Sequence, residues 1–175
     1  MRSTASVALL LLALAPGGLH AQRFGGAPVQ RGWPPVTVGI RAGYDYNSTG
    51  SLVGAQARVA ALPSGFVEVV PNGEITFLNG LREYQYGVDA VVVSGGRSGG
   101  IYAGGGIAWR STIYEGPDRE TRRAPTVVVG ARSSALFGSP FGTQIEMRWT
   151  FPEGDFKPRS LTLGVNFPLW GRGGR

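Results

Sequence analysis

The feature that most constrains this chain is the alternation of its residues between Arg159 and Trp170. Every odd-numbered residue from Leu161 to Leu169 is apolar, and the even-numbered residues between them are small or polar. Successive side chains of a β-strand point to opposite faces, so this pattern predicts a strand with one apolar face. Hydrophobic residues make up 42% of the chain, yet no window approaches the roughly 18 continuous apolar residues of a membrane-spanning helix. The hydrophobic residues are therefore predicted to lie in β-strands.

The same alternation recurs in seven earlier segments, and helical periodicity is absent after residue 35. The third segment keeps its phase through Pro71-Asn72-Gly73, which favours one long strand with a bulge. A strand followed by a hairpin within residues 66–78 is the alternative. Asn79-Gly80 then predicts a two-residue hairpin turn. The predicted strands are residues 36–46, 53–61, 67–77, 84–92, 101–113, 127–135, 144–151 and 159–170.

The first 21 residues have the three parts of a secretion signal. Arg2 supplies a positive charge, residues 7–15 form a short apolar core, and Ala21 offers a cleavage point. Leu19 is larger than usual three residues before such a cut, so the exact bond stays open. The predicted organisation is a signal peptide at 1–21, an irregular lead-in at 22–35, a barrel domain at 36–170 and a short basic tail at 171–175.

Removal of this signal leaves few groups for catalysis. The chain has no cysteine, and its sole histidine, His20, lies within the signal. The commonest general base and the commonest metal ligand are therefore missing from the mature chain. A nucleophilic Ser111, Ser133 or Ser134 would need an acidic residue as its base, and the sequence indicates no such pairing. We predict no catalytic residue, no metal site and no cofactor.

Sorting the predicted strands by face separates charged from apolar side chains. One face carries Val, Ile, Leu, Ala and aromatic residues and no charge. An arginine on a lipid-facing surface at mid-depth would cost about 2–4 kcal/mol, so its absence there is informative. The charged residues of the other face are Arg41, Asp45, Arg58, Glu68, Asp89, Arg110, Arg132, Glu146 and Arg148.

Aromatic residues of the apolar face cluster near strand ends. Two aromatic girdles around an apolar band are typical of a transmembrane barrel, and lipid requires the sheet to close. We predict an all-β fold, an eight-stranded antiparallel up-and-down transmembrane β-barrel with charged residues paired across its lumen. A soluble exported β-barrel, with the faces reversed, is the alternative. One predicted girdle is Tyr44, Tyr46, Phe77, Tyr84, Tyr86, Trp109, Trp149 and Phe151, and the other is Phe137, Phe167 and Trp170.

With this pattern, the chain resembles the small eight-stranded outer-membrane proteins of Gram-negative bacteria, the OmpA/OmpX/OmpW-like superfamily. The residues Thr162, Gly164, Phe167 and Leu169 resemble the C-terminal barrel signal of that superfamily. The resemblance implies an outer-membrane location, periplasmic termini and recognition by the barrel-assembly machinery. The chain departs from the pattern by continuing past the usual terminal aromatic residue.

The predicted function is non-enzymatic, of structural or of lipid- or surface-interaction type, in a monomer. The arginines of the chain are scattered along the sequence, and an exported protein rarely meets nucleic acid. We therefore expect outer-membrane lipid, and not nucleic acid, as the partner. Arg119, Arg122 and Arg123, in a predicted loop at residues 115–123, are candidates for contact with lipopolysaccharide phosphates. A solvated loop with no specific role is the alternative for these arginines. A narrow pore for small solutes is the alternative function.

Overall fold

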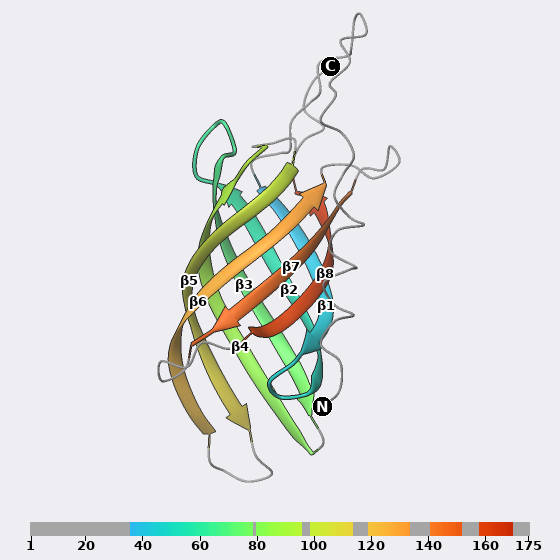
Figure 1. Cartoon of the computed structure of the whole chain (residues 1–175), viewed down its shortest axis with the longest axis vertical. Helices are drawn as coiled ribbons and strands as arrows, with labels where there is room; N and C mark the ends of the chain where they lie inside the picture. Colours follow the sequence, from blue (N-terminus) through green and yellow to red (C-terminus); the bar gives the residue numbers. More distant parts are fainter. Residues whose placement is uncertain are drawn as a thin grey trace, which may run out of the picture. The chain divides into compact units, whose positions relative to one another are not determined.

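The computed structural model describes residues 36–78, 80–95, 99–113, 119–133, 141–151 and 158–169. Its eight strands form one closed antiparallel barrel in which each strand pairs with its sequence neighbours and β1 pairs with β8 (Figure 1). This confirms the predicted fold class. The strands are β1 Val36–Asp45, β2 Gly50–Ala60, β3 Val67–Leu78, β4 Leu81–Val93, β5 Gly99–Ile113, β6 Arg119–Ser133, β7 Gly142–Thr150 and β8 Pro158–Pro168.

The first and last strands close the barrel along nearly their full length. Their pairing runs from Thr37 opposite Pro168 to Asp45 opposite Ser160. The backbone N–H of Tyr46 extends it by donating to the carbonyl of Arg159 at 2.7 Å. Closure leaves neither strand with an unpaired edge. In the described ranges, no helix is long and apolar enough to cross a membrane.

β3 is a single uninterrupted strand. Its pairing with β2 keeps one register on both sides of Pro71, and so does its pairing with β4. The prediction of one long strand is confirmed, and the predicted bulge is wrong. The side chain of Asn72, which could have formed a turn, instead donates to Asp89 Oδ2 at 2.8 Å inside the barrel. A one-residue change of register at Pro71 would have turned the inward-facing side chains of half of β3 outward.

The hairpin after β3 has the predicted length. Leu78 pairs directly with Leu81, which leaves two residues for the turn, and Gly80 has a φ of 77°. That left-handed conformation favours glycine. Within the described residues, a register shift lies elsewhere, between Arg148 and Trp149 where β7 meets β8.

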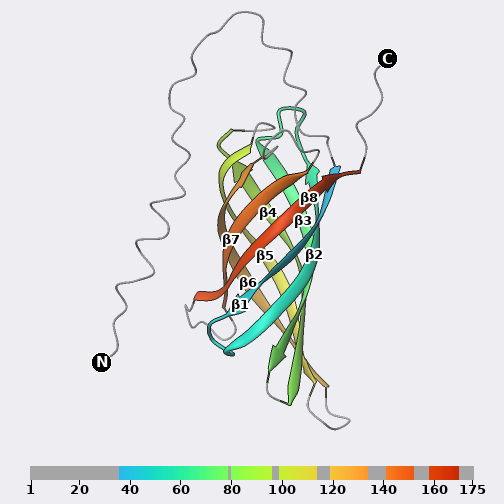
Figure 2. The ribbon, with the colours of Figure 1, turned by 90° about the vertical axis from the view of Figure 1, so that its right-hand side faces the viewer.

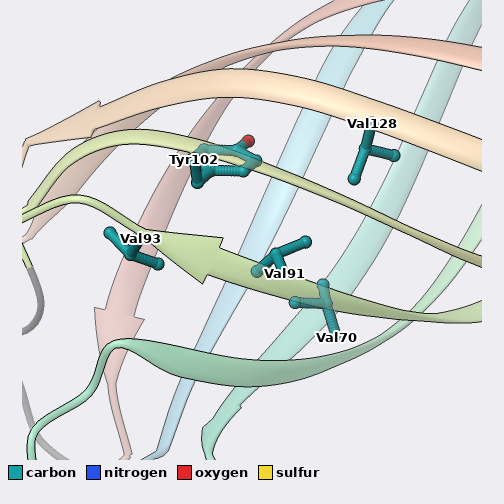
Figure 3. Packing of buried hydrophobic residues seen from close by; sticks show 5 residues of the cluster. All are labelled: Val70, Val91, Val93, Tyr102 and Val128. Carbon is teal, nitrogen blue, oxygen red and sulfur yellow. The ribbon is translucent and has the colours of Figure 1, made fainter.

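The polarity of the barrel is opposite to that of a soluble protein. Ile40 and Leu163, on the outer face, are each 64% exposed, whereas Arg58 and Arg148 point inward and are 2% and 1% exposed. The inner face also holds a small apolar group from β3 to β6 beside the polar residues (Figure 3). We call it the luminal apolar cluster, and its members are Val70, Val91, Val93, Tyr102 and Val128.

The two ends of the barrel differ in which strand ends they contain. We call the end at Val36 and Pro168 the terminal rim, and the end at Asp45 and Gly50 the distal rim. The β5–β6 hairpin continues past the β1–β2 turn at the distal rim (Figures 1 and 2). The connection after β5 is accordingly shorter than the predicted loop at 115–123, because β6 already begins at Arg119.

Exposed aromatic side chains occur at both rims. At the distal rim the rings of Tyr86 and Trp109 stack with centroids 5.6 Å apart. At the terminal rim the rings of Phe141 and Phe167 lie 6.1 Å apart. Two residues of the second predicted girdle, Phe137 and Trp170, lie outside the described residues. Among the distal aromatic residues, those more than a third exposed are Tyr44, Tyr46, Phe77 and Tyr86.

Candidate functional site

The most distinctive feature of the molecule is the set of charged side chains in its lumen. Each of the nine charged residues predicted for this face belongs to a strand whose alternation directs it inward. Eight of them are less than 9% exposed, and the side chain of Arg110 is 15% exposed. They form three groups along the barrel, which we name the central, terminal and distal clusters.

The central cluster is organised around Glu146 of β7. Its carboxylate accepts hydrogen bonds from Arg41 at 2.9 Å, from Arg148 at 3.0 Å and from the Tyr102 hydroxyl at 2.9 Å. The guanidinium of Arg58 lies 3.6 Å from its second oxygen. A buried carboxylate loses its hydration, and these donors replace the lost water. Glu146 thus ties together strands β1, β2, β5 and β7.

Two further acids balance the arginines around Glu146. Arg41 also pairs with Glu74 at 2.9 Å, and Arg148 pairs with Asp89 at 2.8 Å. The Thr126 hydroxyl donates to the other oxygen of Asp89 at 2.6 Å. We define the central cluster as Arg41, Glu74, Asp89, Glu146 and Arg148.

The terminal cluster consists of Arg58, Glu68 and Arg132. Glu68 lies 3.1 Å from Arg58 and 2.7 Å from Arg132, so one carboxylate serves two guanidiniums. Arg58 also covers the ring of Tyr102, with its Cζ atom 4.4 Å from the ring centroid. Both contacts favour a charged arginine in a buried position. The cluster borders the luminal apolar cluster, of which Tyr102 is a member.

The distal cluster closes the opposite end of the lumen. Arg159 pairs with Asp45 at 3.2 Å and with Glu83 at 3.5 Å, and Glu83 also pairs with Arg110. Arg110 donates to the Ser48 hydroxyl at 3.3 Å, which connects the network to the β1–β2 turn. The distal cluster is thus Asp45, Glu83, Arg110 and Arg159.

Four members of these networks were absent from the predicted set of residues. Glu74 shares the inward parity of Glu68, so the alternation itself could have identified it. Glu83 and Arg159 lie near the starts of β4 and β8, where a sequence pattern does not say whether a residue belongs to the strand. The alternation of β5 places Tyr102 on the inner face, but an aromatic residue carries no signal for a partner 44 residues away.

The arginines proposed for lipopolysaccharide contact do not share one face. Arg122 lies opposite Arg110, and Arg123 lies opposite the outward-facing Trp109. Paired residues project to the same side of a sheet, so Arg122 and Arg123 point to different faces of β6. Arg119 pairs with Ile113 through the backbone, and its side chain lies outside the described residues. All three lie in β6, so the predicted loop at 115–123 is wrong from Arg119 onward, and the contact of these arginines with lipopolysaccharide stays a prediction.

The C-terminal motif belongs to β8 and its end. Thr162 and Gly164 face the lumen side of the wall, and the hydroxyl of Thr162 lies 3.5 Å from the carbonyl of Glu146. A Cβ atom on Gly164 would meet the carbonyl of Ile40 at 2.9 Å, so this position needs its glycine for close packing against β1. Phe167 and Leu169 face outward and are 44% and 48% exposed.

Of the serines considered from the sequence as nucleophiles, Ser111 lies on β5 and Ser133 on β6. The hydroxyl of Ser111 lies 2.8 Å from the Thr121 hydroxyl rather than beside an acid. Ser133 ends β6, and Ser134 lies outside the described residues. In the parts of the chain that the structure describes, no three His, Cys, Asp or Glu residues are placed to hold a metal ion. The site is a network of paired charges.

No known family model and no curated protein matches the sequence. Solved structures do match the fold. The crystal structure of the N-terminal β-barrel domain of OprF from Pseudomonas aeruginosa aligns with a TM-score of 0.61 and 14% identity, over 78% of this chain and 98% of that domain. A de novo designed transmembrane β-barrel aligns with a TM-score of 0.51 and 13% identity, over 78% and 97% of the two chains. The chain has the fold of small eight-stranded outer-membrane barrels.

Proposed function

We propose that this protein is an integral β-barrel of a bacterial outer membrane, with a structural or lipid-contacting role and no catalytic one. The observation that carries the proposal is the inverted polarity of the barrel, with Ile40 and Leu163 exposed and Arg58 and Arg148 buried. In water this arrangement would expose a large apolar surface. In a bilayer the same surface is solvated by lipid, and the closed sheet satisfies its own backbone groups.

The ends of the barrel support the same assignment. Aromatic residues such as Tyr86 at the distal rim and Phe167 at the terminal rim have the placement of interfacial girdles. The predicted secretion signal and the likeness in fold to outer-membrane barrels add support for this location. Its partners would be outer-membrane lipids, including lipopolysaccharide, and the assembly machinery that inserts such barrels. The terminal rim would then face the periplasm, and the protein would act as a monomer.

The filled lumen favours a structural role for the barrel over that of an open channel. Ion pairs join strands across the lumen at three levels, represented by Glu83–Arg159, Asp89–Arg148 and Glu68–Arg132. An eight-stranded barrel encloses a space that side chains can fill. Here long arginine side chains occupy it, and they join strands that are not neighbours in the sheet.

Membrane fractionation followed by electrophoresis with and without boiling tests the proposal. A closed, detergent-resistant barrel is expected in the outer-membrane fraction, and its unboiled band should migrate faster than its boiled band. Recovery in the soluble periplasmic fraction would instead indicate an exported soluble barrel and would overturn the proposal.

A further inference from the structure

We propose that a hollow in the outer wall of the barrel binds one acyl chain of an anionic membrane lipid, with a phosphate of that lipid at Arg82. The inference rests on the proposed membrane location and adds a specific ligand site to it. The hollow spans β7, β8, β1, β2, β3 and β4 and has a volume of about 1040 Å³. That volume lies at the upper end of the range of small-molecule pockets, roughly 300–1,000 Å³.

Small residues create the floor of this hollow. Ala55 lies opposite Gly73, and Ala57 follows on the same outward face of β2. A Cβ atom built on Gly73 would meet only the carbonyl of Gln85, at 3.9 Å. The position opens outward, with room for a side chain that the sequence does not supply. A second, smaller depression shares Ala55 and Gly73 and extends the hollow past Ala57 toward the terminal rim.

Bulky apolar residues form its sides. Ile40 and Leu163 border it on β1 and β8, and Tyr84 and Tyr86 border it on β4. Ile40 and Leu163 are each 64% exposed and Tyr86 is 48% exposed, so these side chains stand above the floor. An extended apolar chain fits such a trough because it can contact the floor and both sides at once.

A positive charge lies just beyond the distal end of the hollow. One cross-strand row beyond Tyr84, Arg82 of β4 is exposed and lies opposite Phe77 of β3. Tyrosine side chains of a membrane barrel mark the boundary between hydrocarbon and head groups. Arg82 therefore lies at the level of the phosphates, where its guanidinium can bind two phosphate oxygens. The apolar trough and the arginine together match an anionic amphiphile.

A second copy of this chain fits the same surface less well. A two-fold dimer whose axis passes through the hollow would place the hollow against itself, because such an interface uses the same patch on both partners. Two concave floors facing one another leave a void, and an unfilled void forfeits the contacts that stabilise packing. A flexible chain from the surrounding lipid fills the hollow without that loss.

Fluorescence quenching by brominated lipids tests the site. Trp109 is a natural reporter because its ring stacks on that of Tyr86, a residue that lines the hollow. The probe protein retains Trp109 and carries Trp33→Phe, Trp149→Phe and Trp170→Phe. It is inserted into phosphatidylcholine vesicles that contain either brominated phosphatidylglycerol or, at the same mole fraction, brominated phosphatidylcholine. We expect phosphatidylglycerol to bind up to about fivefold more tightly, the contribution of one basic side chain near an anionic lipid.

Variants separate the two halves of the site. Arg82→Gln should abolish the preference for phosphatidylglycerol, and Ala55→Leu or Gly73→Leu should lower quenching by both lipids because the added side chain fills the hollow. Ala103→Leu is the matched control, since Ala103 is an exposed outward residue of β5 that does not line the hollow. It should leave quenching unchanged.

The outcomes that overturn the inference are distinct from failure of the proposed function. Equal quenching by the two lipids in the parent probe, or no effect of the filling variants, would discard the site. Quenching that falls as the protein-to-lipid ratio rises would assign the hollow to a second copy instead. A gel of unboiled and boiled samples from the same vesicles shows whether the barrel inserted, so a protein that fails to insert contradicts the membrane assignment itself.

Discussion

Arg41 and Glu146 lie 105 positions apart in the sequence, and their side chains meet at 2.9 Å inside the barrel. Neither belongs to a strand that pairs with the other's strand, because β8 lies between β1 and β7. The ion pair therefore joins β1 to β7 on the inner face of the barrel, across the intervening β8. Such a contact depends on closure of the sheet, and it stabilises the closed form specifically.

Replacement of Glu146 by Gln should strongly destabilise the barrel. The amide cannot neutralise the guanidiniums of Arg41 and Arg148, and leaving buried charge uncompensated costs about 3–5 kcal/mol. Unfolding by urea in detergent micelles would measure the loss. Glu83→Gln is the control, with a smaller expected loss because its side chain is 13% exposed at the distal rim. A change below about 1 kcal/mol for Glu146→Gln would show that the network does not hold the barrel together.

An arginine on the outer wall should disfavour insertion according to its depth. Leu163 lies in the middle of β8 and is 64% exposed, whereas Leu169 lies just past the end of that strand at the terminal rim. Leu163→Arg is expected to cost about 2–4 kcal/mol in a bilayer, and Leu169→Arg about 0–1 kcal/mol. Equilibrium unfolding in phospholipid vesicles would measure both. Equal costs for the two variants would contradict the bilayer assignment.

The alternation of the strands made the division into two faces predictable. Period-two patterning separates charged residues such as Arg58 from apolar residues such as Leu163. The aromatic girdles and the predicted export, not the alternation, indicated which face points outward. The same pattern predicted one continuous third strand, because Val69 and Ile75 share a parity across Pro71. The bulge expected there did not form, since the turn-prone Asn72 found a partner in Asp89.

The partners of the charged residues were not predictable from the same pattern. Arg148 pairs with Asp89 across the lumen, and this depends on how far the strands are staggered when the barrel closes. The ends of the strands were also not predictable from the sequence, because the polar residues at the start of β6 resemble those of a loop. Arg123 was therefore assigned to a loop, although it pairs with Trp109 within the sheet.

Vesicles that contain the protein should not swell in small solutes faster than empty vesicles. The three luminal clusters place ion pairs across the lumen at both ends and in the middle, for example Arg159–Glu83, Arg148–Asp89 and Arg132–Glu68. A liposome swelling assay with a small sugar and an amino acid measures the flux. Swelling above that of empty vesicles would favour the narrow pore.

Two glycines of the wall should respond in opposite ways to the same substitution. A Cβ atom on Gly106 of β5 would meet the backbone carbonyl of Val88 and lie 2.7 Å from Asp89 Oδ1, whereas a Cβ atom on Gly73 would have 3.9 Å to its nearest neighbour. Gly106→Ala should therefore destabilise the barrel by about 1–3 kcal/mol, the usual cost of overpacking. Gly73→Ala should be neutral or stabilising, because alanine loses less backbone freedom on folding. Urea unfolding of both variants in the same detergent measures the two changes in the free energy of unfolding. Equal destabilisation would mean that the strands do not approach as closely at Gly106 as the structure shows.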